Sequence, residues 1–123
     1  MKTILTSFFA LSLLFILGGC EPTDPAIIKV FVRSSSNQLI DGAKVIIIAD
    51  QQSTPATLAY VDTTFTNSSG FTSFDMDPYF AVSGESSKTG YFDIIVKYNN
   101  KIAYGYTRAK VHTTAVETIY LPN

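Results

Sequence analysis

The sequence predicts an all-β domain, a seven-stranded Greek-key β-sandwich over residues 26–123. Beyond residue 19, Ile, Val and Thr are frequent and the leucines fall to Leu39, Leu58 and Leu121. β-Branched residues suit a pleated sheet better than a helix. Seven short segments alternate apolar and polar side chains with a period of two, and no segment carries a 3.6-residue apolar stripe. Short strands without intervening helices are typical of β-sandwiches with Greek-key connections.

The composition indicates a single folded domain and argues against a protein that binds nucleic acid. The chain has 123 residues, which suits one domain, and 15% of them are charged, with a formal net charge of −1. This low charge, together with 46% hydrophobic residues, argues against disorder. The 9 basic residues are outnumbered by 10 acidic ones and form no basic run, whereas proteins that bind phosphate backbones cluster Lys and Arg. We therefore expect no nucleic-acid partner.

Residues 1–19 have the layout of a secretory signal. Lys2 supplies one positive charge, and an apolar run from Ile4 to Leu17 follows, interrupted only by small hydroxyl residues. The run is too short for a comfortable membrane-spanning helix, and a short apolar segment after a positive charge is typical of signal peptides. We expect residues 1–19 to be a lipoprotein signal peptide, on the evidence of the residues that follow.

The end of this run, Leu17-Gly18-Gly19-Cys20, resembles the bacterial lipobox. The resemblance implies that the Cys20 thiol receives diacylglycerol, that the leader is cleaved, and that Cys20 becomes the first mature residue. Residues 20–25 contain two prolines and would form the lipidated N-terminus and its tether. In such lipoproteins an Asp after the cysteine retains the protein at the inner membrane. Glu21 stands there instead, which favours the outer membrane of a Gram-negative bacterium.

Two other roles for Cys20 stand beside lipidation, a small buried hydrophobe and a reactive thiol. Cys20 is the only cysteine, so the chain has no intramolecular disulfide. The stability of an exported domain of this kind must then come from its hydrophobic core.

The first four strands are expected over 26–33, 43–49, 57–66 and 71–76. The second contains a run of apolar residues on both faces, as expected of a central strand that is covered on each side. Turn-forming residues fill 67–70, so the third and fourth strands are predicted to form a hairpin.

The last three strands are expected over 91–98, 101–110 and 113–121. Residues 77–90 contain Pro, Gly and Ser and are predicted to be a long connection that crosses between two sheets. The fifth and sixth strands are predicted to form a hairpin, because Asn99-Asn100 tolerates the positive φ of a type I′ turn.

Three segments resemble the carboxypeptidase-regulatory-like and transthyretin-like (prealbumin-like) sandwiches, which are immunoglobulin-like. Residues 37–45 match the family's opening of a polar loop followed by Gly-Ala-x-Val, 64–74 match its Thr-rich strand with a turn before Gly and an aromatic residue, and 91–96 match a later strand. The resemblance implies the fold and no catalytic residues. Gly42 and Gly70 occupy positions where positive φ is expected.

The single histidine, His112, lies between the last two expected strands. A Ser-His-Asp hydrolase needs a strained nucleophile turn such as Gly-x-Ser-x-Gly, which the sequence lacks. One histidine and one cysteine also fall short of a typical zinc site. We expect His112 to lie in an exposed loop, and we expect neither enzymatic activity nor a cofactor.

Asp75 and Asp77 flank Met76, and Asp62 lies on the strand before them. Carboxylates suit calcium, but no EF-hand spacing or repeated Asp-x-Asp loop is present. The alternative is that these residues solvate and end a strand, and we expect no metal. Paired carboxylates also serve glycoside hydrolysis, although a small domain without tryptophan offers little platform for a sugar ring.

Tyrosines supply the candidate contact surface. Tyr98, Tyr104 and Tyr106 belong to one expected hairpin, and Tyr120 lies on the strand that follows it. Tyr104 and Tyr106 are two residues apart and share a face, which leaves two alternatives. The face either points outward as a protein or glycan contact surface or, as we expect, points inward and fills the core. Gly105 between them predicts a bulge or a close backbone approach.

The sequence therefore predicts a non-catalytic outer-membrane lipoprotein that binds an envelope protein as an accessory subunit. The alternative is a carbohydrate-binding or adhesion module at the cell surface, with a glycan as its partner. In either case the membrane is contacted through lipid at Cys20. Asp62-Thr63-Thr64 also resembles the O-glycosylation sequon of exported Bacteroidota proteins, which implies a modification of Thr63.

Overall fold

The computed structural model describes residues 24–83 and 88–123. The expected signal peptide at 1–19 and the lipidation site Cys20 lie outside these residues. Of the tether at 20–25, Asp24 and Pro25 are described, and both are exposed. Within the described part of the chain, no helix is both long and apolar enough to cross a membrane.

The described residues form seven strands and one short helix. Their order is β1 (Ile27–Arg33), β2 (Lys44–Ala49), β3 (Val61–Phe65), β4 (Phe71–Asp75), α2 (Asp77–Ser83), β5 (Thr89–Tyr98), β6 (Lys101–Lys110) and β7 (Thr114–Tyr120).

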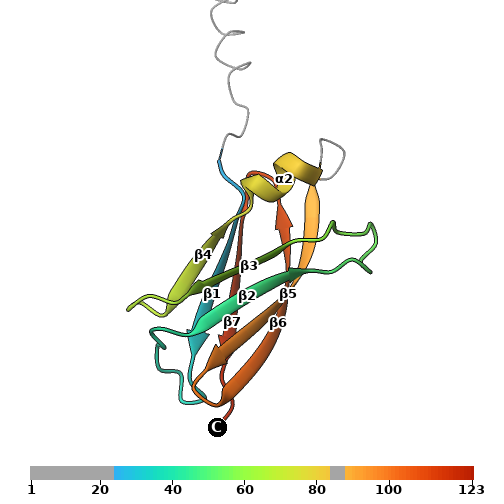
Figure 1. The fold of residues 1–123 in the computed structure, drawn as a ribbon. Helices are drawn as coiled ribbons and strands as arrows, with labels where there is room; N and C mark the ends of the chain where they lie inside the picture. Colours follow the sequence, from blue (N-terminus) through green and yellow to red (C-terminus); the bar gives the residue numbers. More distant parts are fainter. Residues whose placement is uncertain (1–23, 84–87) are drawn as a thin grey trace, which may run out of the picture.

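The strands make two sheets that lie against each other, as Figure 1 shows. One sheet has the order β4-β1-β7 and the other β3-β2-β5-β6. Strands β1 and β7 are parallel, and the remaining neighbours are antiparallel. The prediction of an all-β, two-sheet domain with seven strands is confirmed.

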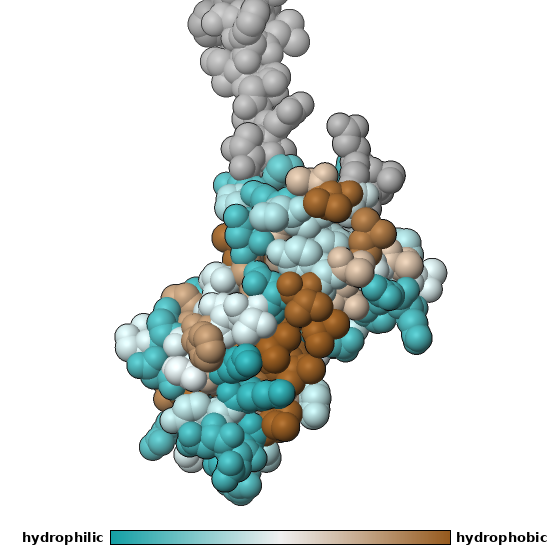
Figure 2. Space-filling view, in the orientation of Figure 1, coloured by the Kyte–Doolittle hydropathy of each residue, from teal (hydrophilic) through white to brown (hydrophobic). Residues whose placement is uncertain are grey.

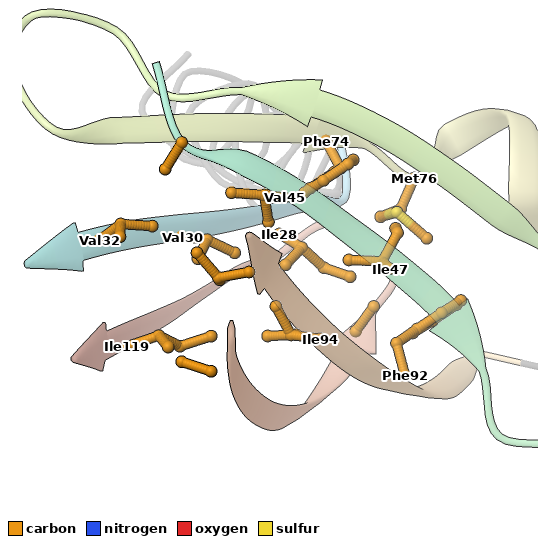
Figure 3. Close-up of a cluster of buried hydrophobic side chains, with 14 of the residues drawn as sticks. Ile28, Val30, Val32, Val45, Ile47, Phe74, Met76, Phe92, Ile94 and Ile119 are labelled. Carbon is orange, nitrogen blue, oxygen red and sulfur yellow. The ribbon is translucent and has the colours of Figure 1, made fainter. Parts of the chain in front are cut away.

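The core lies between the sheets and follows from the period of two. Ile28, Val30 and Val32 alternate with outward residues along β1 and are fully buried. From the other sheet, Val45 and Ile47 of β2 face them, and the β2–β5 register places Val96 and Ile94 beside these two residues. Figure 3 shows the inward side chains of the two sheets meeting in one cluster. Burial of these apolar side chains is the main source of stability in the absence of a disulfide.

The predicted hairpin between the third and fourth strands is wrong. Strand β3 pairs with β2, whereas β4 pairs with β1 in the other sheet, so residues 67–70 carry the chain from one sheet to the other. The Asn67 side chain accepts hydrogen bonds from the main-chain N–H groups of Ser69 and Phe71, and Gly70 has the expected positive φ of 76°. The same turn residues suit a corner between sheets and a hairpin within one.

The connection 77–90 crosses between the sheets as expected, but it contains the unpredicted helix α2. Asp75 Oδ1 accepts a hydrogen bond from the Asp77 N–H, and Asp77 Oδ1 accepts one from the Ala26 N–H. Tyr79 is the buried residue of the helix, and its ring packs edge-on against Phe92 with the centroids 5.2 Å apart. A helix of seven residues is too short to display an apolar stripe in the sequence.

The remaining turns agree in part with expectation. Gly42 has a φ of 79°, and the β5–β6 hairpin closes at the Tyr98–Lys101 pair. In its turn Asn99 has a φ of 54°, while Asn100 is not among the residues with positive φ. A type I′ turn requires positive φ at both positions, so that detail is wrong.

Candidate functional site

The outer side of the four-stranded sheet carries the largest set of exposed apolar side chains in the described part of the chain. We call it the apolar face. It comprises Val61 and Phe65 of β3, Ile46 and Ile48 of β2, Ile95 of β5, and Ile102, Tyr104 and Tyr106 of β6. Figure 2 shows a continuous brown patch where β2 and β5 lie in Figure 1.

Strand register arranges the apolar face in three outward rows. The middle row is apolar except for one threonine, whereas one flanking row contains two lysines and the other contains one aspartate. In strand order β3-β2-β5-β6, the rows are Phe65, Lys44, Lys97 and Ile102; Thr63, Ile46, Ile95 and Tyr104; and Val61, Ile48, Asp93 and Tyr106.

These side chains remain open to solvent. Val61 is 65% exposed, Phe65 60% and Tyr104 73%. The expectation that the second strand is covered on both faces therefore holds only for its inner face, since Ile46 and Ile48 are half-buried on an open one. Because large exposed apolar patches on soluble proteins are typical of interaction sites, the apolar face is the candidate contact surface.

Tyr104 and Tyr106 share this outward side, so the expectation that their face fills the core is wrong. The inward residues of β6 are Ala103, Gly105, Thr107 and Ala109. A Cβ built on Gly105 would lie 2.8 Å from Cδ1 of Ile119 on β7. Because β6 approaches β7 this closely at Gly105, a larger side chain at this inward position would clash with Ile119. The predicted close backbone approach at Gly105 is confirmed.

The other two tyrosines do not join the surface. Tyr98 is half-buried and packs against the core, and Tyr120 lies on β7 in the other sheet beside Arg33. Tyr91, which sequence reasoning missed, does join: its ring stacks on Tyr106 with the centroids 6.3 Å apart and the planes at 24°. The available signal was that Tyr91, Asp93 and Ile95 alternate on one side of the same strand.

Asp50 lies just beyond β2 and is hydrogen-bonded both to the apolar face and to the loop that follows β2. Its Oδ2 accepts a 2.7 Å hydrogen bond from the Tyr106 hydroxyl, and its Oδ1 accepts one of 3.0 Å from the Gln52 N–H. The hydrogen bond to Asp50, with smaller contributions from desolvation and from the charges of Asp50 and Asp93, raises the pKa of Tyr106 to about 12. Tyr106 is therefore a neutral hydrogen-bond donor at physiological pH.

A cavity of about 480 Å³ opens next to this hydrogen bond. Asp50, Gln51 and Gln52 line it from the loop, and Val61 and Asp93 line it from the sheet. The cavity combines carboxylate and amide groups with the apolar edge of the face, so it can accept a polar or cationic group of a bound molecule.

The remaining candidate residues are scattered. His112 is exposed in the turn before β7, with a φ of 60°, and its Nδ1 lies 2.8 Å from the main-chain oxygen of Asp24. Asp62 lies on β3 in one sheet, whereas Asp75 ends β4 in the other sheet and Asp77 begins α2. The side chains of Asp75 and Asp77 accept hydrogen bonds from main-chain N–H groups. Among the described residues, no three His, Cys, Asp or Glu side chains come together as metal ligands.

Thr63 is exposed in the middle row of the apolar face. A glycan attached there would stand on this face, so modification of Thr63 and protein binding over the same row exclude each other.

No protein-family model matches this chain, and no curated protein matches it.

Proposed function

We propose that this protein is a non-catalytic lipoprotein, anchored through Cys20 in the outer membrane of a Gram-negative bacterium, that binds another envelope protein as an accessory subunit. The apolar face is the proposed contact surface. The lipobox-like Leu17-Gly18-Gly19-Cys20 supports the anchor, and the two-sheet architecture supports a Greek-key, prealbumin-like sandwich as its fold. With a second acyl chain or more, such an anchor holds stably on a membrane.

The observation that carries the binding proposal is the apolar, half-buried centre of the apolar face, flanked by the exposed side chains of β3 and β6. Ile46 and Ile95 are register partners in the middle row, with Tyr104 beside them. The centre of the face is branched aliphatic, and the charged residues lie in the two flanking rows. This arrangement matches the apolar core and polar rim of protein–protein interfaces. Sugar rings are instead held by flat aromatic platforms and hydrogen bonds.

One observation favours the glycan alternative. The ring of Tyr106 stacks on that of Tyr91, and its hydroxyl donates a hydrogen bond to Asp50, which lines the cavity together with Gln52 and Asp93. Aromatic rings beside amides and carboxylates are able to hold a sugar by stacking and by hydrogen bonds to its hydroxyl groups. A glycan module predicts binding that depends on Tyr106 and not on Ile95.

Site-specific photo-cross-linking in living cells tests the proposal. Benzoylphenylalanine replaces Tyr104 on the apolar face or, as the matched control, Val116, which is 55% exposed on the other sheet. A discrete protein adduct from position 104 and not from position 116 is expected. Equal adducts from both positions, or none from position 104, would contradict protein binding through this face.

The anchor and the glycan alternative have separate readouts. Cys20→Ala is expected to abolish incorporation of labelled palmitate and to release the protein from the membrane fraction. A variant that still incorporates palmitate and stays in the membrane fraction would exclude the anchor.

Titration of the protein with envelope glycans, monitored by calorimetry, tests the glycan alternative. Heat of binding that Tyr106→Ala removes and Ile95→Ser leaves unchanged would favour the glycan module over protein binding.

A further inference from the structure

The apolar face is complementary to itself. We propose that a second copy of this chain covers it, with the strands of the two copies antiparallel about a two-fold axis along the middle row. This inference rests on one part of the proposed function, that the apolar face binds protein, and it places a second copy of this chain there instead of a different envelope protein. Most soluble oligomers are symmetric, and a two-fold interface brings the same patch of both copies together.

Symmetry decides which residues meet. An axis along Thr63, Ile46, Ile95 and Tyr104 keeps each strand opposite its own copy and reverses the strand direction, so the two flanking rows exchange places. Lys97 of one copy then faces Asp93 of the second copy, and the same contact recurs on the other side of the axis. Both residues are exposed on β5. Opposite charges therefore meet twice.

The apolar residues of the flanking rows also match under this exchange. Phe65 faces Val61 along β3, and Ile102 faces Tyr106 along β6. Along β2, Lys44 of one copy faces Ile48 of the second copy, and its methylene groups cover that isoleucine. Its ammonium group then lies toward Asp50 of the second copy, which is two residues after Ile48.

The alternative two-fold arrangement, with the axis parallel to the strands, brings like charges together. The rows then stay in place and the strand order reverses, so β2 faces β5 and Lys44 meets Lys97 twice. Thr63 would also face Tyr104. Like charges in an interface disfavour an arrangement, so the charges on the face select the antiparallel dimer. Arg108 lies in the row of Tyr91, beyond the overlap of the three rows.

Charge exchange tests the antiparallel contact. In the Lys97→Asp variant, aspartates face each other across the interface, and in the Asp93→Lys variant, lysines do. The double variant, with both changes in one chain, restores opposite charges. We expect the dissociation constant of the full chain in density-matched detergent, measured by sedimentation equilibrium, to rise by about tenfold or more in each single variant. It should return to within about threefold of wild type in the double variant.

Recovery in the double variant separates charge pairing from misfolding of a single variant. A wild-type chain that stays monomeric at about 100 μM, far above the micromolar dissociation constant of a modest interface, would overturn the inference. So would a double variant that dimerises no better than the single ones.

Cross-linking on the axis tests the geometry in membranes. Residues of the middle row face their own copies, so Thr63→Cys and Tyr104→Cys should each form dimers with a short bismaleimide, since packed sheets lie about 10 Å apart. Val116→Cys, on the other sheet, and the wild-type chain, whose only thiol would be Cys20, are the controls. Cross-linking that is equal in the controls would overturn the inference.

The photo-cross-linking experiment separates this inference from the function on which it rests. An adduct from position 104 with the mass of two copies supports the inference. An adduct with a different protein, together with monomeric wild type in sedimentation, overturns the inference and leaves the proposed function standing. No adduct at position 104 overturns both.

Discussion

The Tyr106 hydroxyl on β6 donates a 2.7 Å hydrogen bond to Oδ2 of Asp50, beyond the end of β2, and so spans the intervening strand β5. The same bond is the largest cause of the raised pKa of Tyr106, about 12. Because Asp50 also accepts a hydrogen bond from the Gln52 N–H, its carboxylate joins the edge of the apolar face to the cavity. The pKa of Tyr106 therefore reports on whether its hydrogen bond to Asp50 is intact.

We expect a tyrosine transition near pH 12 in the ultraviolet absorbance titration of the folded protein. Tyr106→Phe should remove this transition, and Asp50→Asn should move it toward the ordinary tyrosine pKa of about 10. The pKa is raised in the folded state, so the stability contribution is fully present below about pH 10 and is lost as the pH rises through about 12. Tyr104→Phe, on the same strand, is the control. A transition near pH 12 that survives in Tyr106→Phe would contradict this assignment.

Two buried threonines should respond in opposite ways to the same substitution. Thr66 Oγ1 accepts a 2.9 Å hydrogen bond from the Ala43 N–H and donates one of 2.7 Å to the Ile40 carbonyl. Thr107 Oγ1 is buried and has no hydrogen-bond partner in the described part of the chain. Both threonines are 4% exposed.

Thr66→Val leaves two main-chain groups without this partner, so we expect the free energy of unfolding to fall by about 1–3 kcal/mol. Thr107→Val replaces an unpaired hydroxyl with a methyl group and should leave the free energy of unfolding unchanged or raise it by up to about 1 kcal/mol. Urea denaturation of the two variants beside wild type measures both. An equal loss in the two variants would show that burial, and not hydrogen bonding, determines the cost.

The contact between Gly105 and Ile119 should limit the size of the residue at position 105. A Cβ there would lie 2.8 Å from Ile119 Cδ1 and 3.2 Å from its Cγ1. We expect Gly105→Ala to lower the free energy of unfolding by about 1–3 kcal/mol, as overpacking does. Ile119→Val removes Cδ1 and should recover part of this loss in the double variant. Strictly additive losses in a double-mutant cycle would contradict a direct clash.

The sequence predicts those elements that depend on the alternation of apolar and polar residues within a segment. It does not predict features that depend on which strands pair with each other. The alternation in 26–33 and the apolar run in 43–49 predict β1 and β2, because burial between two sheets requires those patterns. Residues 67–70 predict a turn but not the sheet that the next strand enters, because β4 joins β1 only through contacts distant in sequence.

The tyrosine orientation escaped prediction for a similar reason. Alternation establishes that Tyr104 and Tyr106 share a side of β6, but the choice of side depends on the close approach of β7. The small inward residues Ala103, Gly105 and Ala109 were the signal in the sequence for that approach. The apolar face itself was hidden because a strand that is apolar on both sides looks the same whether one side is covered or open.

The short helix α2 should depend on one ring. Tyr79 is 2% exposed, and its ring packs against Tyr60 at 5.5 Å and Phe92 at 5.2 Å between centroids. Its hydroxyl oxygen also accepts a 3.3 Å hydrogen bond from the Leu58 N–H. Removal of a buried aromatic ring costs about 3–5 kcal/mol, whereas loss of a long hydrogen bond at the edge of the core costs about 1 kcal/mol.

We therefore expect Tyr79→Ala to lower the free energy of unfolding by about 3–5 kcal/mol and Tyr79→Phe by about 1 kcal/mol, in urea denaturation. Hydrogen exchange of the Phe80 N–H, which donates to the Met76 carbonyl at 3.1 Å, reports the helix directly and should accelerate in Tyr79→Ala beyond the global change. If Tyr79→Phe costs as much as Tyr79→Ala, the hydroxyl anchors α2. If neither changes the exchange of Phe80, the helix is stable without the ring, and the packing of Tyr79 against Phe92 is a consequence of its position.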